Sequence, residues 1–414
     1  MVNLGEYVIQ YSGNGSVLRC LAVADRNSSG SPGQLEALRL ALELAHTQGK
    51  VHLYDRIRQI VTNHLGDLSF LNSDHYMSND SFKDWELQFK EQIERKELAV
   101  NQAKNAGLKD SMKISIIEEG DMFLDAGEPG LALKTYMRLK DIQSTKDQQY
   151  ELYTKIARAA LQKSNFSYAQ NICQKAISVG TASLPLKSVV QAIVGVCHLE
   201  SKNYKQAARA LLEVRQGQLY HEFLTDSDIA IYTSLCALIS FDRSEVKNEI
   251  LKSKTFGTFL EEEPRCIEIL DAFLSCRYFD LIQKLNLIRD SLKYDLFIGT
   301  KLSDIYLEIK NRAIADFLKP FKRVKLDVLA HAFNSSVEDI EKQVARLIMD
   351  GTVEARIDSH NKIIQSRFAN EKIVTYREAL NMGKRFLRNN ESMLLRMNMV
   401  QQKLIVKEAK KGQR

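Results

Sequence analysis

The chain is poor in proline, with five in 414 residues, although proline is a common helix breaker. It also lacks a long uninterrupted apolar run. The stretch Val189–Cys197 is interrupted by Gln191 and is far shorter than the roughly 20 residues needed to cross a bilayer. The first residues carry neither a basic cluster nor a continuous apolar segment, which argues against a secretory signal. We therefore expect long helices and no membrane span.

Residues that bind metals or form disulfides are present but not clustered. No two of the six cysteines have C-x-x-C spacing, and none of the eight histidines forms H-x-H or H-E-x-x-H. Zinc requires clustered thiolate or imidazole ligands. We interpret the cysteines as reduced core residues, which is typical of a protein of the nucleus and cytoplasm. We expect no metal, no cofactor and no catalytic residue.

Two short motifs contain residue types found in active sites. Gly13–Gly15 lacks the third glycine of a dinucleotide-binding loop, and Asp358–His360 places triad residue types consecutively. Consecutive side chains point in different directions, whereas a triad needs three that converge. We interpret the first motif as a flexible turn and the second as a hairpin turn.

The apolar pattern divides the chain into successive segments. We expect residues 1–34, which end in a Gly/Ser-rich loop, to be flexible, and residues 35–115 to form N-terminal helices. Helix pairs repeat over residues 116–292, where Ala132, Ala169 and Ala207 are spaced by 37 and 38 residues. Small residues let paired helices approach closely. This segment predicts a mainly α fold with a tetratricopeptide-like, right-handed solenoid arm.

Residues 293–370 have a different pattern. Two short helices, the second beginning after Ser335, are followed by two strand-like segments that a polar turn separates. This order is typical of a winged helix. An exposed strand edge pairs readily with a strand of another protein, so we expect the wing to contact a neighbouring subunit. The expected interface residues of the wing are Val353, Ala355, Arg356, Ile357, Ile363 and Ile364.

A winged helix can also bind DNA, and this alternative depends on charge. The second helix carries four acidic residues, Glu338, Asp339, Glu341 and Asp350, against only two basic ones. A recognition helix lies in the major groove beside phosphates, which would repel it. Nucleic acid is therefore not the expected partner, although a winged-helix nucleic-acid-binding protein remains an alternative.

A long amphipathic helix is predicted in residues 371–414. Such a helix cannot bury its apolar face alone, so we expect it to join a bundle with other chains. The seam residues that we expect to make these contacts are Tyr376, Leu380, Leu387, Leu394, Met397 and Leu404. From Asn370 onward there are eleven basic and four acidic residues. This basic tail could bind an acidic partner or act as a nuclear signal, but a solvated helix end is the preferred interpretation, since helix C-termini favour cations.

Several stretches resemble the PCI-domain family, the scaffolding subunits of the proteasome lid, the COP-9 signalosome and the translation initiation factor eIF-three. They are Asp228–Arg243, Asn311–Phe321, Ala332–Leu347, Gly351–Ile364 and Met382–Lys384. Two shorter segments within these stretches, Cys236–Arg243 and Asp358–His360, favour the signalosome members over the related proteasome-lid subunit.

The resemblance implies a function that the residue pattern alone does not give. It implies a non-catalytic scaffold subunit of an isopeptidase complex that removes a ubiquitin-like modifier from cullin–RING ligases, with the zinc site on another subunit. The implied partners are other PCI-domain subunits, metalloprotease-domain subunits and cullin–RING ligase components. The paralogous subunit of the proteasome lid is the alternative within the same class.

Overall fold

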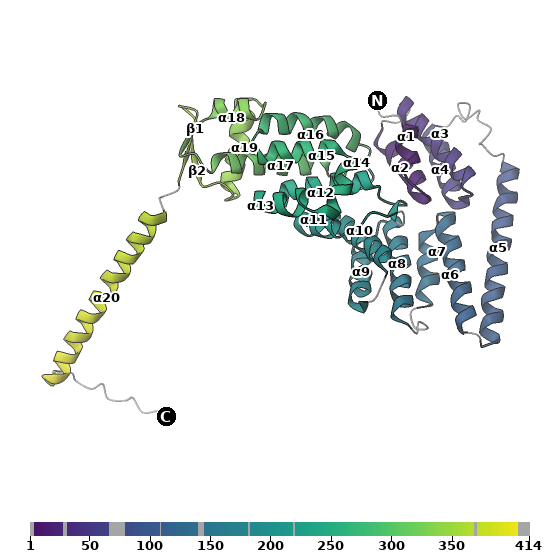
Figure 1. Cartoon of the computed structure of the whole chain (residues 1–414), viewed down its shortest axis with the longest axis horizontal. Helices are drawn as coiled ribbons and strands as arrows, with labels where there is room; N and C mark the ends of the chain where they lie inside the picture. Colours follow the sequence, from purple (N-terminus) through teal and green to yellow (C-terminus); the bar gives the residue numbers. More distant parts are fainter. Residues whose placement is uncertain are drawn as a thin grey trace. The chain divides into compact units, whose positions relative to one another are not determined.

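The computed structural model describes residues 4–27, 31–65, 79–107, 109–139, 145–180, 183–217, 220–367 and 371–404 (Figure 1). The chain divides into two compact units, Met1–Ala313 and Ile314–Arg414. The division falls after residue 313, whereas we expected the arm to end at residue 292. The chain is mainly helical with one small sheet, as predicted, and no described helix is long and apolar enough to cross a bilayer.

The first unit consists of helices. Its N-terminal helices are α1 (Leu4–Ile9), α2 (Asn14–Arg26), α3 (Pro32–Thr47), α4 (Val51–Leu65) and α5 (Asn79–Asn105). The arm continues with α6 (Lys109–Ala126), α7 (Pro129–Met137), α8 (Lys146–Gln162), α9 (Phe166–Val179), α10 (Leu184–Glu200) and α11 (Tyr204–Leu212). The remaining elements are α12 (Asp226–Ser240), α13 (Arg243–Glu245), the π-helical turn η3 (Val246–Leu251), α14 (Lys254–Glu262), α15 (Pro264–Leu274), α16 (Tyr278–Leu292) and α17 (Leu302–Leu318), the last of which continues into the second unit.

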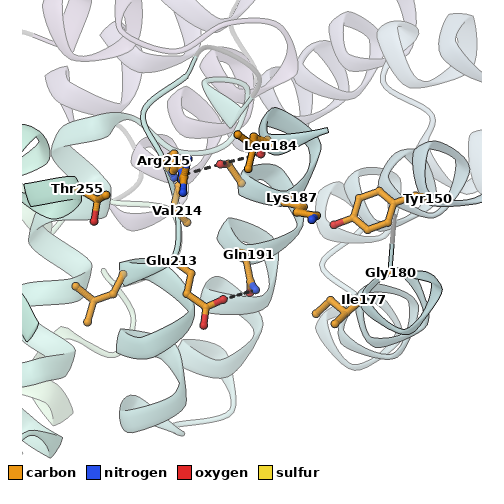
Figure 2. A pocket seen from close by; sticks show the side chains of 12 residues that line it. Tyr150, Ile177, Gly180, Leu184, Lys187, Gln191, Glu213, Val214, Arg215 and Thr255 are labelled. Atoms are coloured by element: carbon orange, nitrogen blue, oxygen red, sulfur yellow. Dashed lines mark hydrogen bonds between the residues drawn. The ribbon is translucent and has the colours of Figure 1, made fainter. Parts of the chain in front are cut away.

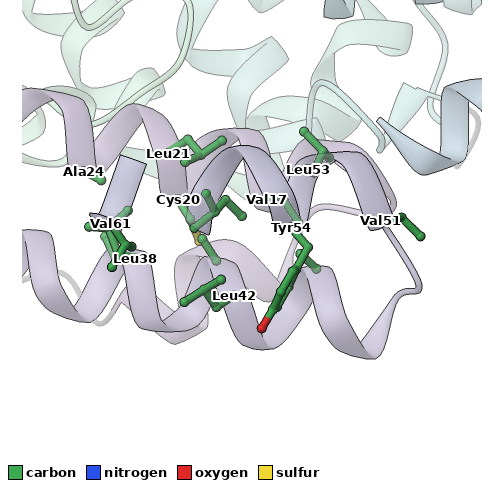
Figure 3. Packing of buried hydrophobic residues seen from close by; sticks show 14 of the residues in the cluster. Val17, Cys20, Leu21, Ala24, Leu38, Leu42, Val51, Leu53, Tyr54 and Val61 are labelled. Carbon is green, nitrogen blue, oxygen red and sulfur yellow. The ribbon is translucent and has the colours of Figure 1, made fainter. Parts of the chain in front are cut away.

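The N-terminal segment is folded, and the expectation of a flexible segment over residues 1–34 is wrong for its described part. Helices α1 and α2 occupy it, and α2 packs on α3. Figure 3 shows the resulting core, in which Val17 and Cys20 of α2 meet Leu38, Leu42 and Tyr54. All five are fully or almost fully buried, so burial of apolar surface orders this segment.

The repeat predicted from sequence is visible in the turns between paired helices. The same left-handed backbone conformation occurs two residues before α7, α9, α11 and α16, at Gly127, Ser164, Lys202 and Cys276. At each turn the next residue donates its backbone N–H to a carbonyl five residues earlier, at 2.9–3.0 Å. Four helix pairs therefore share one turn geometry, at spacings that are multiples of about 37 residues.

Small residues allow the first three of these helix pairs to pack closely. Ala132, Ala169 and Ala207, near the starts of α7, α9 and α11, are completely buried, as the repeat pattern predicted. On the facing helices, a Cβ at Gly120 would lie 2.4 Å from the Tyr136 ring, and one at Gly195 would lie 2.6 Å from Leu211. These contacts are too close for any side chain larger than hydrogen, so they fix the separation of the helices in each pair.

The second unit contains a winged helix. Its elements are β1 (Arg323–Lys325), α18 (Leu326–Ala332), α19 (Val337–Met349), β2 (Ala355–Asp358), β3 (Ile363–Ser366) and α20 (Glu371–Gln401). The two helices and the hairpin agree with the sequence prediction, whereas β1 was not predicted. The strands are antiparallel in the order β1-β3-β2, with Val324 and Ile357 both opposite Ile364.

Candidate interaction surfaces

The sheet order decides which predicted wing residues can lie at an edge. Ile363 and Ile364 belong to β3, the central strand, which pairs with β1 on one side and β2 on the other. Their expected position at the interacting edge is therefore wrong. A proline at Ile364 would damage the ladder of the wing itself. The sequence could not reveal this, because the short strand β1 precedes both helices and shows no clear alternation.

Strand β2 lies at an outer edge of the three-stranded sheet, where no other described strand pairs with it. Of the residues predicted there, Arg356 is exposed, Val353 and Ile357 are half-buried, and Ala355 is buried in the wing. A cavity of about 180 Å³ next to β2 is lined by Val353, Ala355 and the half-exposed Phe321. The outer edge of β2 offers unpaired backbone groups, which suit pairing with a partner strand.

The recognition-helix position of the wing is acidic. Ser336 caps α19 by accepting a hydrogen bond from the Asp339 N–H, and the Ser359 hydroxyl donates to Glu341 at 2.6 Å. The apolar face of α19, including Ile340 and Val344, is buried, so the charged side chains lie on its accessible face. The acidic side chains on which the charge argument depends therefore lie where a recognition helix would face phosphates.

Helix α20 presents apolar side chains to solvent over its whole length. All of its described side chains are exposed, including the predicted seam residues Tyr376, Leu380, Leu387, Leu394 and Met397, which are 46–65% exposed. Leu404 is exposed too but lies beyond the end of α20 at Gln401, so it is not part of the helical seam. Most of the basic tail predicted after Lys403 lies outside the described residues.

The apolar face of α20 is wider than the seam predicted from sequence. Met382, Phe386, Met393 and Val400 are 60–71% exposed and, at 100° per residue, form a second stripe beside the first. A face of this width fits between two or more neighbouring helices better than against one. The spacing of these four residues in the sequence is the signal for the wider face.

A buried charge network in the first unit was not predicted. Arg19 of α2 is fully buried and forms ion pairs with Asp228 of α12 at 3.1 Å and Asp295 at 2.9 Å. Tyr11 donates to Asp228 at 2.6 Å, and Tyr232 donates to Asp295 at 2.5 Å. Burial opposes ionisation of Asp295, but Arg19 and Tyr232 outweigh it and hold its pKa below the usual value. These contacts attach the N-terminal helices to the arm.

The two motifs that contained active-site residue types have structural roles. Asp358 accepts hydrogen bonds from the backbone and side chain of Asn361, which confirms the hairpin turn. Gly15 lies in the first turn of α2, where a Cβ would come within 1.7 Å of the Glu222 carbonyl oxygen. The interpretation of Gly13–Gly15 as a flexible turn is therefore wrong, because this glycine permits close helix packing.

Five of the six cysteines are buried, as predicted, and Cys276 is exposed. Cys276 occupies one of the left-handed turns of the repeat, which places its side chain outside the core. Among the described residues, no group of three or more His, Cys, Asp or Glu side chains is arranged to hold a metal ion.

Two protein-family models match separate parts of the chain. A model described as the PCI domain matches residues 275–368, which include the winged helix. The chain contains a PCI domain over these residues. A second model, described as 26S proteasome subunit RPN7, matches residues 81–249 of the arm.

Individual relatives extend the similarity over most of the chain. COP9 signalosome complex subunit 1 of Arabidopsis thaliana is 29% identical over 99% of this chain and 92% of its own length. COP9 signalosome complex subunit 1b of Drosophila melanogaster is 30% identical over 76% of this chain and 62% of its own length. A 26S proteasome non-ATPase regulatory subunit 6 homolog of A. thaliana is 23% identical over 51% of this chain and 54% of its own length. The resemblance to signalosome members seen in the sequence is confirmed.

Proposed function

We propose that this chain is a non-catalytic scaffold subunit of a COP9 signalosome-type complex. In this role it supports the removal of a ubiquitin-like modifier from cullin–RING ubiquitin ligases, while another subunit carries the zinc site. The similarity to COP9 signalosome complex subunit 1 over 99% of the chain supports the choice of complex. The observation that carries the scaffold role is the uncovered apolar face of α20, which requires partner helices.

Two surfaces of the chain would contact other subunits of the complex. The apolar face of α20 would enter a helical bundle with other PCI-domain and metalloprotease-domain subunits. The outer edge of β2 would pair with the wing of a neighbouring subunit. The helical arm would remain available for cullin–RING ligase components.

The experiment is a native purification of the tagged full-length chain, with partners identified by mass spectrometry. We expect a zinc isopeptidase, cullins and other PCI-domain subunits. Replacing Leu387 and Leu394 by Asp should remove these partners, because it places two charges on the apolar face of α20. Arg385→Asp with Ser392→Asp is the matched control, since both exposed residues have the same spacing of seven on the opposite face. If the leucine variant retains all partners, α20 is not the assembly helix.

The proteasome lid is the second candidate, favoured by the match of the arm to the RPN7 model. Recovery of the proteasome regulatory particle in the same purification would select it. The proposal also places the chain in both nucleus and cytoplasm, which imaging of the tagged full-length protein tests.

A further inference from the structure

A groove of about 500 Å³ on the arm runs along one face of α10 (Figure 2). Leu184, Lys187, Ser188 and Gln191 form this face, at the i, i+3, i+4 and i+7 positions of the helix. One side of the groove comes from α8 and α9, and the other from the end of α11, the residues after it and the start of α14. The residues of the two sides are Tyr150, Ile177 and Gly180 on one side and Leu212, Glu213, Val214, Arg215 and Thr255 on the other.

Tyr150 contributes a hydroxyl donor to the groove. Its side chain is only 3% exposed, yet its hydroxyl makes no hydrogen bond within the described part of the chain. In Figure 2 the hydroxyl is directed toward Lys187. Burial raises the pKa of Tyr150 further above neutral, to about 12, so the hydroxyl is a donor over the whole physiological pH range. The hydroxyl faces the groove, where it can donate a hydrogen bond to an acceptor on a ligand.

The remaining polar groups favour a negatively charged ligand. Lys187 and Arg215 are exposed, and neither has an ion-pair partner among the described residues. Ser188 already accepts from the Arg215 N–H at 3.2 Å, and Glu213 already accepts from Gln191 at 2.6 Å. Two cations and one hydroxyl donor are thus available, against one carboxylate that is already hydrogen-bonded. A carboxylate ligand matches this set.

The apolar part of the groove indicates what accompanies the carboxylate. Ile177 is 46% exposed and Leu184 is 56% exposed, on the same groove as the cations. The face of α10 from Leu184 to Gln191 is about 10 Å long at a rise of about 1.5 Å per residue. An extended peptide advances about 3.3 Å per residue, so about three residues span it.

We propose that this groove binds an extended segment of a partner protein in which a carboxylate side chain neighbours an apolar one. The apolar side chain packs on Ile177 and Leu184, and the carboxylate accepts hydrogen bonds from Lys187 and Tyr150. Arg215 on the opposite side fixes the direction of the segment through a second acidic group or a terminal carboxylate. The proposal depends on the arm alone and holds whichever PCI complex contains the chain.

The test measures peptide binding to the full-length chain by fluorescence anisotropy. The probes are labelled peptides that alternate Leu and Asp, and matched peptides with Asn in place of Asp. We expect saturable binding of the Asp peptides and about tenfold weaker binding of the Asn peptides. Lys187→Glu or Arg215→Glu should weaken binding about tenfold or more, and Tyr150→Phe several-fold with the ring packing retained. Lys175→Glu, at an exposed site on α9 outside the groove, should change nothing.

Three results would overturn the proposal. The first is equal affinity, or no binding, for the Asp and Asn peptides. The second is an equal loss in the Lys175 variant, which would show attraction by overall charge. The third is displacement of the peptide by inorganic phosphate at a similar concentration, together with unchanged binding by Leu184→Ser. That pair of results would make the groove a site for free anions instead of peptides.

Discussion

Replacing Arg19 by Met tests whether the buried network attaches the N-terminal helices to the arm. Arg19 is the only cation that the described contacts place between Asp228 and Asp295, and its side chain is fully buried. Met has a similar length and fills much of the same volume, so the main change is loss of the charge. Two buried carboxylates are then left without their counter-ion.

The expected cost follows from this geometry. Removing one partner of a buried ion pair lowers the free energy of unfolding by about 3–5 kcal/mol, because an uncompensated charge stays buried. At about 2.1 cal/mol/K per residue, the unfolding entropy of the 313-residue unit makes this a fall in melting temperature of about 5–8 °C. The triple variant Arg19→Met, Asp228→Asn, Asp295→Asn should recover part of the loss, since no buried charge remains.

Differential scanning calorimetry and amide hydrogen exchange of α2 measure the two consequences. The deficit of the Arg19 variant should shrink as the pH falls from 7 to 5, because protonation neutralises the stranded carboxylates. Loss of protection in α2 should accompany the lower melting temperature. If the melting temperature falls by less than 1 °C, or if the triple variant melts no higher than the single one, the Arg19 network does not stabilise the attachment of α2.

Three further predictions address other parts of the chain. Lys50 is buried, its ammonium group makes no hydrogen bond among the described residues, and burial lowers its pKa to about 8. At this residue the unfolded chain therefore binds more protons than the folded one between pH 8 and 10.5, whereas buried cysteines and tyrosines, whose pKa values burial raises, act in the opposite direction. The free energy of unfolding of the natural chain minus that of Lys50→Met should therefore rise with pH in that range in urea denaturation, and a constant difference would contradict the lowered pKa of Lys50. Ser164→Gly should raise the free energy of unfolding by up to about 1 kcal/mol, because glycine relieves the strain of the left-handed backbone. Gly127→Ala should lower it by at least about 1 kcal/mol, because the added Cβ would clash with Leu53. Thermal melts in which both variants shift in the same direction would contradict the shared turn geometry. The isolated chain should sediment as a larger species than its Leu387→Asp, Leu394→Asp variant at high concentration, because α20 exposes its apolar face, and equal sedimentation would argue against self-association.

Local patterns were sufficient for the elements whose two faces differ in polarity. The recurrence of Ala132, Ala169 and Ala207 located the helix pairs, because close packing requires small residues at one repeated position. The alternation after Gly351 located the hairpin, and the apolar spacing from Tyr376 located α20. The last two signals are each contained in a few consecutive turns or strands, and the first is a recurrence of one local pattern at a fixed spacing.

The features that the sequence did not reveal depend on contacts between distant residues. Arg19 pairs with residues more than 200 positions away, so no local pattern could show that a charged residue in an apparently flexible segment is fully buried. The central position of Ile364 depends on β1, which lies about 40 residues earlier in the chain.

Residue periodicity alone predicts the helical repeat, the winged helix and the long terminal helix, because it indicates which face of each element is apolar. Three features depend on the packing of distant elements: which strand is at the edge of the wing, how the N-terminal helices attach to the arm, and that Tyr150, Lys187 and Arg215 line one groove. Those outcomes depend on how separate elements pack together, and a linear pattern carries no record of that packing.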